Sequence, residues 1–159
     1  MTPAVNVLNK NKISYNLHEY SHDTASESYG LEAVEKLGIN ANRVFKTLVV
    51  SLTNKELAKE LAVAVIPVSS KLSMKHMAKA CGAKKAIMAK PNEVSRVTGY
   101  VLGGVSPLGQ KRALKTVIDS SAMDLTGIFI SAGRRGLEIE MDPADLAKVT
   151  LASFDQVSQ

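Results

Sequence analysis

Apolar residues recur at two spacings along this chain, and each spacing predicts a different kind of element. A spacing of three or four residues puts side chains on one face of a helix, whereas alternation or a short apolar run is typical of a strand. Helical spacing is found over residues 2–8, 31–37, 73–81, 91–97 and from 142 onward. Strand patterns are found over residues 13–17, 43–52, 61–66, 86–88, 116–118, 128–130 and 137–140. Residues 21–28 are polar and irregular, which predicts a loop.

Residues with special backbone properties mark the ends of these elements. Thr2, Ser73 and Asp142 precede helical patterns, and their side-chain oxygens can accept hydrogen bonds from the first free N–H groups of a helix. Gly38 follows a helical pattern, where a left-handed conformation ends a helix. Pro67 has no N–H group and therefore ends the second long strand pattern.

The order of the elements predicts the fold class. Hairpin-like strand pairs alternate with helices, which favours an α+β (mixed α/β) fold. The last two strand patterns are joined by residues 133–136 and predict a hairpin. No repeat, low-complexity tract or long linker interrupts the 159 residues, and domains commonly contain about 100–200 residues. Residues 1–159 are therefore expected to form a single domain.

Composition narrows the partners and the compartment. The 20 Lys and Arg residues exceed the 15 Asp and Glu residues, and the net charge of +5 favours an anionic partner without distinguishing nucleic acid, membrane and acidic metabolite. The single cysteine, Cys81, excludes an internal disulfide, so a reducing, cytoplasmic environment is expected. No segment approaches the roughly 20 apolar residues of a membrane span, and the first residues lack the pattern of a signal peptide. No membrane partner is expected.

The common catalytic motifs are absent. The sequence has no G-x-S-x-G nucleophile elbow, no H-E-x-x-H, no P-loop and no dinucleotide fingerprint. His18 and His22 are four residues apart in a strand-to-loop region, where that spacing does not put them on one face. His76 lies on a basic helical pattern, and Cys81 is expected at a helix C-terminus, which disfavours a thiolate. We therefore expect no metal site and no cofactor.

Lys46 is the most informative single residue. Within the strand pattern of residues 43–52 it shares one face with Val44 and Leu48, and the opposite face is apolar as well. A strand that is apolar on both faces is normally buried on both, and a buried ammonium group is costly without a partner or a pocket. Position alone leaves two interpretations open: a functional lysine that faces a pocket, or a lysine near a strand end whose head group reaches solvent.

Two glycine-containing segments could bind an anion. Residues 98–109 (TGYVLGGVSPLG) include paired glycines, which allow the close approach of a backbone and successive N–H groups aimed at an oxyanion or a phosphate. Residues 131–136 (SAGRRG) carry a hydroxyl group and two guanidinium groups. The plainer interpretation of the first segment is a bulge and turn, and that of the second is an exposed hairpin tip.

Together with residues 44–48 (VFKTL), these two segments resemble the YbaK family, whose members are free-standing relatives of the editing domain inserted in bacterial prolyl-tRNA synthetases. The resemblance extends over essentially the whole chain, is carried mainly by the glycine-rich motif, and is strongest to the Cys-tRNA(Pro) deacylase branch. Ala132 stands where the family commonly has glycine, and Arg134 where it commonly has lysine. Arg134 keeps the charge, whereas Ala132 matters only if its φ is positive or if it contacts the substrate.

The resemblance implies a fold, a reaction and a set of site residues. The fold is a mixed, partly barrel-like β-sheet flanked by helices. The reaction is cleavage of the ester that links cysteine to tRNA(Pro), assisted by the substrate's own thiol, which attacks the carbonyl carbon and forms a thiolactone. Lys46 and the backbone N–H groups of Gly103, Gly104 and Val105 would stabilise the developing negative charge. The residues expected to line the pocket are Tyr20, Tyr29, Thr47, Ser106, Pro107 and Ser131.

The resemblance also gives the basic surface a partner. Phosphates of tRNA would be bound without sequence readout by Lys84, Lys85, Lys111, Arg112 and Lys115. A small free-standing domain is expected to need help in recognising the correct tRNA, which implies a transient complex with prolyl-tRNA synthetase. Two alternatives stay open. One is a deacylase that uses activated water on another small residue, such as alanine on tRNA(Pro), and the other is a non-catalytic module that binds tRNA or the synthetase.

Overall fold

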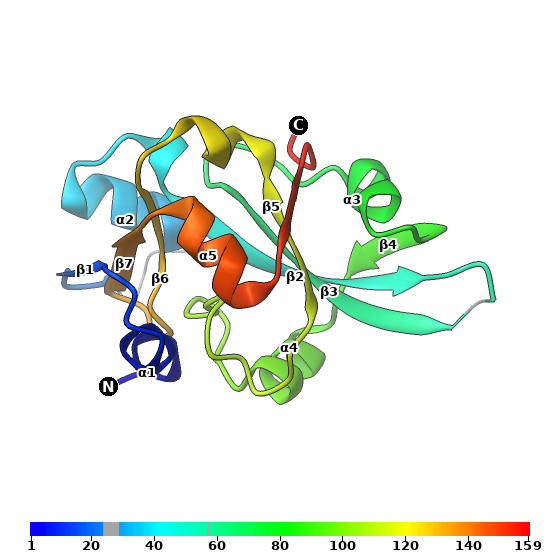
Figure 1. Ribbon diagram of the computed structural model, residues 1–159, viewed down its shortest axis with the longest axis horizontal. Coiled ribbons are helices and arrows are strands. Elements are labelled where there is room, and N and C mark those ends of the chain that lie inside the picture. Colours follow the sequence, from blue (N-terminus) through cyan, green and yellow to red (C-terminus); the bar gives the residue numbers. More distant parts are fainter. Residues whose placement is uncertain (24–28, 57) are drawn as a thin grey trace.

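The computed structural model describes residues 1–23, 29–56 and 58–159, so residues 24–28 of the predicted loop lie outside the described residues. Its helices are α1 (Pro3–Lys10), α2 (Tyr29–Leu37), α3 (Met74–Ala80), α4 (Pro91–Thr98) and α5 (Pro143–Thr150) (Figure 1). Its strands are β1 (Asn16–Glu19), β2 (Phe45–Thr53), β3 (Lys59–Pro67), β4 (Lys85–Met88), β5 (Lys115–Asp119), β6 (Ile128–Ser131), β7 (Leu137–Met141) and β8 (Ser153–Asp155). Short 3₁₀ helices, η1 (Ala41–Arg43) and η2 (Ser120–Asp124), precede β2 and follow β5.

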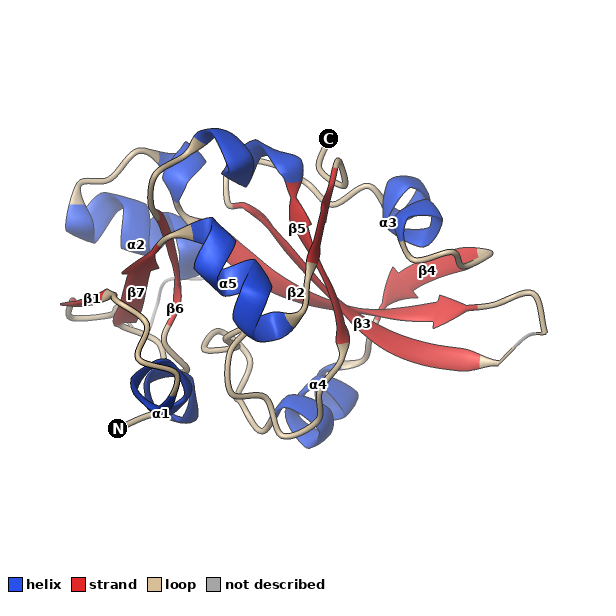
Figure 2. Ribbon diagram, viewed as in Figure 1, coloured by secondary structure: helices blue, strands red, loops and turns tan. Residues whose placement is uncertain are grey.

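The strands form two sheets that meet at the start of β2 (Figure 2). The larger sheet has the order β4-β2-β3-β5-β8, with antiparallel pairs on both sides of β2 and parallel pairs on both sides of β5. The smaller sheet, β1-β7-β6, is antiparallel and contains the predicted hairpin. Val44, directly before β2, forms a parallel bridge with Phe129 of β6. The mixed α+β fold is thus confirmed, with the strands divided between two linked sheets rather than lying in one.

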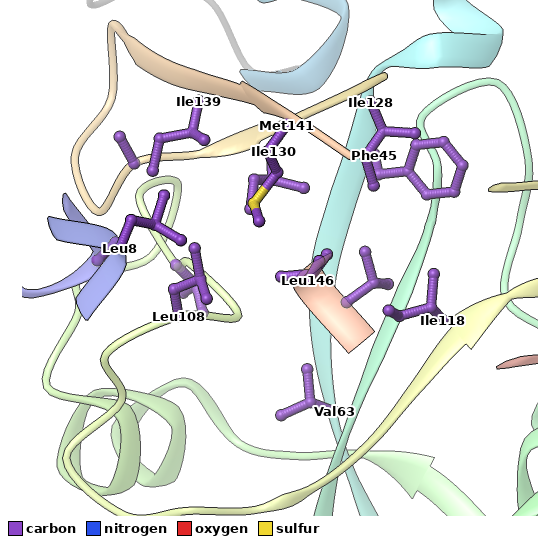
Figure 3. Close-up of a cluster of buried hydrophobic side chains, with 14 of the residues drawn as sticks. Leu8, Phe45, Val63, Leu108, Ile118, Ile128, Ile130, Ile139, Met141 and Leu146 are labelled. Atoms are coloured by element: carbon purple, nitrogen blue, oxygen red, sulfur yellow. The ribbon is translucent and has the colours of Figure 1, made fainter. Parts of the chain in front are cut away.

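The main hydrophobic core lies between the two sheets and is closed by α1 and α5 (Figure 3). Leu8 of α1 and Leu146 of α5 are fully buried in it, together with Ile118 of β5 and Ile139 of β7. Burial of one such side chain contributes roughly 1.5–3 kcal/mol. A second cluster, which includes Met77, packs α3 against the larger sheet. The start of β2 is therefore held in a well-packed frame.

The helices begin at the predicted capping residues and are short. The Thr2 hydroxyl accepts the Val5 N–H at 3.3 Å, and the Ser73 hydroxyl accepts the His76 N–H at 3.2 Å. The Asp142 carboxylate caps α5 in the same way. Within the described ranges, no helix has the length and apolar character needed to cross a membrane.

Two parts of the secondary structure differ from the predictions. The first strand begins at Asn16 rather than at residue 13, because Ile13 and Tyr15 pack against the core before the pairing with β7 begins. The strand β8 was not predicted. Its three residues pair with β5 across a long stretch of sequence, and a contact of that kind leaves no local pattern.

Candidate active site

A cavity of about 370 Å³ lies where the two sheets meet, beside the start of β2. Its volume falls in the range of roughly 300–1,000 Å³ that is usual for small-ligand sites. Segments far apart in the sequence contribute to its wall: the end of β1, the first residues of α2 and β2, the glycine-rich loop and the β6–β7 hairpin. The lining residues are Tyr20, Tyr29, Gly30, Val44, Phe45, Lys46, Thr47, Leu48, Leu102, Gly103, Val105, Ser131, Arg135 and Glu138.

Lys46 brings a positive charge to this cavity. It lies near the start of β2, opposite Ile66 of β3, and is half-buried. No carboxylate within the described residues pairs with it, and burial alone lowers the pKa of its ammonium group. Of the two interpretations that the sequence left open, the structure therefore supports the pocket-facing lysine.

Glu138 brings a carboxyl group to the same cavity. It lies in β7 opposite Ser131 of β6, and only 7% of the residue is exposed. Burial raises its pKa to about 8. Burial also raises the pKa of Tyr20 to about 12, with a further contribution from the negative charge of Glu138. The alternating pattern of residues 137–140 predicts a strand whose glutamates face solvent, so sequence reasoning missed this residue.

Lys46 and Glu138 do not form an ion pair with each other. No salt bridge joins them, and burial is the cause of the pKa shift of each. They come from different sheets, β2 and β7. The wall of the cavity therefore carries two separate ionisable groups, the ammonium group of Lys46 and the carboxyl group of Glu138.

Two residues with hydroxyl groups, Thr47 and Ser131, line the same cavity. The Thr47 hydroxyl is buried and has no hydrogen-bond partner among the described residues. The Ser131 hydroxyl accepts the Gly133 N–H at 3.2 Å. Both residues line the cavity, as the family resemblance implied. An unpartnered buried hydroxyl is costly unless a ligand supplies the missing hydrogen bond.

The α2 side of the cavity is held in place by Arg135. Its guanidinium carbon lies 4.3 Å from the centre of the Tyr29 ring. Its Nε lies 3.5 Å from the carboxylate of Glu32, which is 5% exposed. Its Nη2 donates to the carbonyl oxygen of Asp23 at 2.6 Å. The sequence left Arg135 open between an anion-binding guanidinium group and part of an exposed hairpin tip, and the structure places it in the cavity wall.

The paired glycines of the 98–109 loop approach the protein itself. Gly103 has a φ of +91°, and a Cβ there would lie 3.0 Å from the Tyr29 ring. A Cβ on Gly104 would lie 2.9 Å from the Cα atom of Arg134. Larger residues at either position would therefore push the loop away from α2 or from the hairpin. This close approach accounts for both glycines without a ligand.

The expected oxyanion donors are reduced from three to two. The Gly104 N–H donates to the carbonyl oxygen of Val101 at 3.0 Å, and Gly104 does not line the cavity. Gly103 and Val105 do line it, and their N–H groups have no hydrogen-bond acceptor among the described residues. The correction follows from the turn at residues 101–104, which uses the N–H of Gly104 internally.

Ser106 and Pro107 do not reach the cavity, contrary to the expectation for them. Ser106 is fully buried, and its hydroxyl accepts the Leu108 N–H at 3.2 Å. Pro107 faces a different hollow, which is lined by residues of α1 and α5 as well. Both residues stabilise the loop that carries Gly103 and Val105.

The two departures from the family pattern have no consequence for the cavity. Ala132 does not have a positive φ, is fully buried and donates its N–H to the carbonyl oxygen of Leu137 at 2.9 Å. Arg134 is exposed and pairs with Glu19 at 3.3 Å. Neither residue lines the cavity.

The histidines and the cysteine lie away from the cavity. His18 Nε2 is 2.9 Å from the carboxylate of Glu140, which also pairs with Arg43. His76 is exposed on α3, and Cys81 is buried at its C-terminus. Over the described parts of the chain, no group of three or more His, Cys, Asp or Glu side chains could hold a metal ion.

The five predicted phosphate-binding residues are exposed and do not line the cavity. Lys85 pairs with Thr53, which is seven residues from Lys46 along β2. At about 3.3 Å per residue, this separation is about 23 Å. Arg112 and Lys115 line a separate hollow of about 390 Å³, and the Lys115 ammonium also donates to the carbonyl oxygen of Cys81 at 3.0 Å.

Comparisons with known proteins agree on one family. A family model described as an aminoacyl-tRNA editing domain matches residues 26–149. A candidate Cys-tRNA(Pro)/Cys-tRNA(Cys) deacylase of Enterococcus faecalis, EbsC, is 35% identical over 99% of this chain and 93% of its own. The solved structure of the hypothetical protein APE2540 matches with a TM-score of 0.86 and 25% identity over 99% of both chains. That of a candidate trans-editing enzyme for prolyl-tRNA synthetase matches with a TM-score of 0.80 and 19% identity, over 99% of this chain and 95% of the other.

The family model and the relative from E. faecalis thus define the class of protein. The chain belongs to the aminoacyl-tRNA editing domain family, and it is an aminoacyl-tRNA deacylase. This finding confirms the family membership expected from the sequence and favours the enzyme over the non-catalytic module.

Proposed function

We propose that this deacylase cleaves cysteine from mischarged tRNA(Pro) and that the thiol of the substrate assists. The observation that carries this proposal is that the described wall of the cavity supplies two cationic side chains (Lys46 and Arg135), hydroxyl groups and N–H donors, but no cysteine and no histidine. A nucleophilic serine or threonine would need an adjacent base, which the described wall does not offer in the usual form of a histidine. The relative from E. faecalis, whose name specifies cysteine esters, supports the choice of substrate.

In the proposed reaction, the substrate sulfur attacks the carbonyl carbon of its own ester. A sulfur–carbon bond forms, the bond from carbon to the terminal ribose oxygen breaks, and the thiol proton passes to that oxygen. The products are a cysteine thiolactone and free tRNA, and water then opens the thiolactone to cysteine. Intramolecular attack removes much of the entropic barrier. A residue without a thiol cannot react in this way, which provides selectivity against correctly charged tRNA.

Lys46 and the glycine-rich loop stabilise the charge that develops in this reaction. The ammonium group of Lys46 lies in a partly desolvated site, where a fixed charge acts more strongly than in water. The N–H groups of Gly103 and Val105 are the remaining candidate donors to the carbonyl oxygen as it becomes an oxyanion. Thr47, Ser131, Tyr20 and Tyr29 contact the aminoacyl group or the terminal nucleoside.

The charge distribution supports a separate surface for the tRNA backbone. Residues 61–118 contain ten basic residues and one acidic residue, Glu93. The basic residues, which we call the basic region, are all exposed: Lys71, Lys75, Lys79, Lys84, Lys85, Lys90, Arg96, Lys111, Arg112 and Lys115. None of them takes part in an ion pair found among the described residues. Unpaired surface cations suit phosphate binding without sequence readout.

Two further properties belong to this proposal. Residues 1–159 act as a single editing domain in the cytoplasm, where tRNA is charged. A transient complex with prolyl-tRNA synthetase supplies the tRNA specificity, since phosphate contacts carry no sequence information. Adding the synthetase to the deacylase should therefore increase the preference for tRNA(Pro) over other tRNAs charged with cysteine, and no change in that preference would contradict the complex.

A second mechanism, attack by activated water, is favoured by Glu138. A carboxyl group with a pKa of about 8 in the cavity has the properties of a general base. Water attack would also cleave esters without a thiol, such as alanine on tRNA(Pro). The two mechanisms therefore differ in their substrates.

The deciding experiment compares three substrates on the same tRNA(Pro). Single-turnover cleavage is measured for Cys-tRNA(Pro), for the same substrate with its sulfur alkylated, and for Ser-tRNA(Pro). We expect rapid cleavage of the first and background rates for the other two, and we expect free thiolactone to be trapped by an added amine. Comparable cleavage of all three substrates would establish water attack instead.

A further inference from the structure

Glu138 has no hydrogen-bond or ion-pair partner among the described residues and no part in the thiol-assisted reaction. It is 7% exposed, lines the cavity, and accepts no hydrogen bond or ion pair from any described residue. Glu140, two residues further along the same face of β7, provides a contrast. Its carboxylate is bound by His18 at 2.9 Å and by Arg43 at 3.2 Å. A buried carboxyl group without a partner is costly, so Glu138 points to a ligand group that donates hydrogen bonds.

The substrate of an aminoacyl-tRNA deacylase carries one cationic group, the α-ammonium. It lies one bond from the carbon that bears the carbonyl group, so it enters the cavity together with the ester. Lys46 suits the carbonyl oxygen of the same aminoacyl ester, where negative charge develops during the reaction. Lys46 and Glu138 come from different sheets and line the same cavity, so one ligand there can contact both.

We propose that Glu138 binds the α-ammonium group of the aminoacyl ester, an inference that rests on the proposed function. The enzyme thereby selects esters with a free amino group and rejects N-acylated ones, a class that includes peptidyl-tRNA. Such a selection matters for an enzyme that hydrolyses tRNA esters, because growing peptides are attached through the same bond.

The charges of the two groups support this contact. Burial raises the pKa of the Glu138 carboxyl group to about 8, and a cation beside that group favours its ionised form. A hydrogen bond from an ammonium group to a carboxylate is charge-assisted and stronger than a neutral one. The wall around Glu138 includes other ionisable groups, namely Tyr20, Arg135 and Lys46, and Glu32 lies behind Arg135. None of these is bonded to the Glu138 carboxyl group.

The test compares Cys-tRNA(Pro) with N-acetyl-Cys-tRNA(Pro), in which the thiol is free and only the amino group is blocked. Single-turnover rates are divided by the uncatalysed rates, because acetylation changes the intrinsic lability of the ester. The proteins are the wild type, Glu138→Gln, Glu138→Asp and the matched control Glu140→Gln. Circular dichroism verifies that each variant is folded.

We expect the wild type to prefer the free-amine substrate by at least about tenfold, the usual effect of one charge-assisted hydrogen bond. Glu138→Gln should lose most of this preference by acting more slowly on the free-amine substrate alone. Glu138→Asp and Glu140→Gln should keep it.

Four results would overturn the inference. An unchanged preference in Glu138→Gln would mean that acetylation is excluded by size alone. An equal loss on both substrates would assign Glu138 to the chemical step, as a base for water. A wild type that cleaves the two substrates equally would exclude recognition of the amino group while leaving the proposed function intact. Failure of the wild type on Cys-tRNA(Pro) itself would contradict the proposed function, and this inference with it.

Discussion

The two ends of the β2–β3 hairpin carry charge in opposite ways. At the start of β2, most charged groups around the cavity are paired, although Lys46 and Glu138 in its wall are not paired with any described residue. The ion pairs found among the described residues all join β1, α2, η1, the β6–β7 hairpin and β7. At the other end, beside α3 and β4, lies much of the basic region, which has no ion pair among the described residues (Figure 1). Polar groups are thus fixed at one end and left available at the other.

This difference separates two tasks of a tRNA deacylase. Chemistry requires groups held in fixed positions in a desolvated site, and the ion pairs around the cavity hold together the elements that form its wall. Binding of a phosphate backbone requires cations that can exchange water and counterions for phosphates. The distance of about 23 Å between the ends suits a substrate whose reacting ester lies at the tip of a long polyanion.

Glu138, like Lys46, has no ion pair among the described residues of the cavity end, and removing its charge should stabilise the fold. Its pKa rises from an ordinary 4.5 to about 8 on folding. Above pH 4.5, Glu138 is therefore ionised in the unfolded chain but still protonated in the folded chain. The free energy of unfolding is unaffected by this group below pH 4.5 and decreases as the pH rises towards 8. Glu138→Gln should lack this fall and be more stable than wild type by about 2–3 kcal/mol at pH 7. Urea unfolding at pH 5 and pH 8 measures it.

Glu140→Gln is the control of opposite sign. Hydrogen bonds from His18, together with the positive charges of His18 and Arg43, lower the pKa of Glu140 in the folded state. Its contribution to stability is present above its unfolded pKa and is lost as pH falls through the lower folded value. If the free energy of unfolding of the wild-type protein does not decrease between pH 5 and pH 8, Glu138 is not buried in its neutral form.

Arg135→Gln should loosen the α2 wall of the cavity. The change removes the contact with the Tyr29 ring and leaves the buried Glu32 without its cation. Loss of one partner of a largely buried pair destabilises the fold, here by about 2 kcal/mol, since Glu32 keeps its hydrogen bond from the Asp23 N–H. KM for the mischarged tRNA should rise several-fold.

The neighbouring residue offers a matched control. Arg134→Gln removes an exposed pair with Glu19, and such pairs contribute less than about 1 kcal/mol. Thermal unfolding and steady-state kinetics on both variants measure the difference. Equal effects of the two substitutions would show that Arg135 does not hold the cavity wall.

Neutralising part of the basic region should weaken tRNA binding without changing the chemical step. For the triple variant Lys79→Gln, Lys84→Gln and Lys85→Gln, we expect KM to rise about tenfold at moderate salt. The slope of the logarithm of the tRNA binding constant against the logarithm of the salt concentration should become less steep by about two to three. The limiting rate should stay the same, because these side chains lie far from the cavity.

The control for this variant has the same net charge. Lys10, Lys36 and Lys148 are equally exposed but lie at the ends of α1, α2 and α5, outside the basic region. Their replacement by Gln should leave KM and the salt slope nearly unchanged. An equal loss in both triple variants would mean that net charge, and not position, attracts the tRNA.

Local signals made much of the fold predictable from the sequence. Capping by Thr2, Ser73 and Asp142 depends on residues three positions away or fewer, and Pro67 ends β3 through its own missing N–H. Lys46 stood out because an ammonium group in a strand apolar on both faces needs a pocket. β8 depends on pairing with a distant strand and therefore could not be predicted.

The site was harder to predict, because its parts meet only in three dimensions. Glu138 has the alternating pattern of an exposed residue, and only its place opposite Ser131 in the hairpin brings it to the cavity. The family resemblance suggested the whole glycine-rich motif. The structure separates Gly103 and Val105, which line the cavity, from Ser106 and Pro107, which support the loop.

The measurement that tests the central claim most directly is cysteine release from Cys-tRNA(Pro) by the wild type and by Lys46→Ala, with tRNA affinity measured in parallel. The matched control is Lys36→Ala, an exposed lysine outside the cavity. We predict that Lys46→Ala lowers the single-turnover rate by about 100-fold or more, the usual effect of removing one group that stabilises an oxyanion, while tRNA affinity changes little. Equal rates for Lys46→Ala and the wild type, or a loss explained entirely by weaker tRNA binding, would contradict the account.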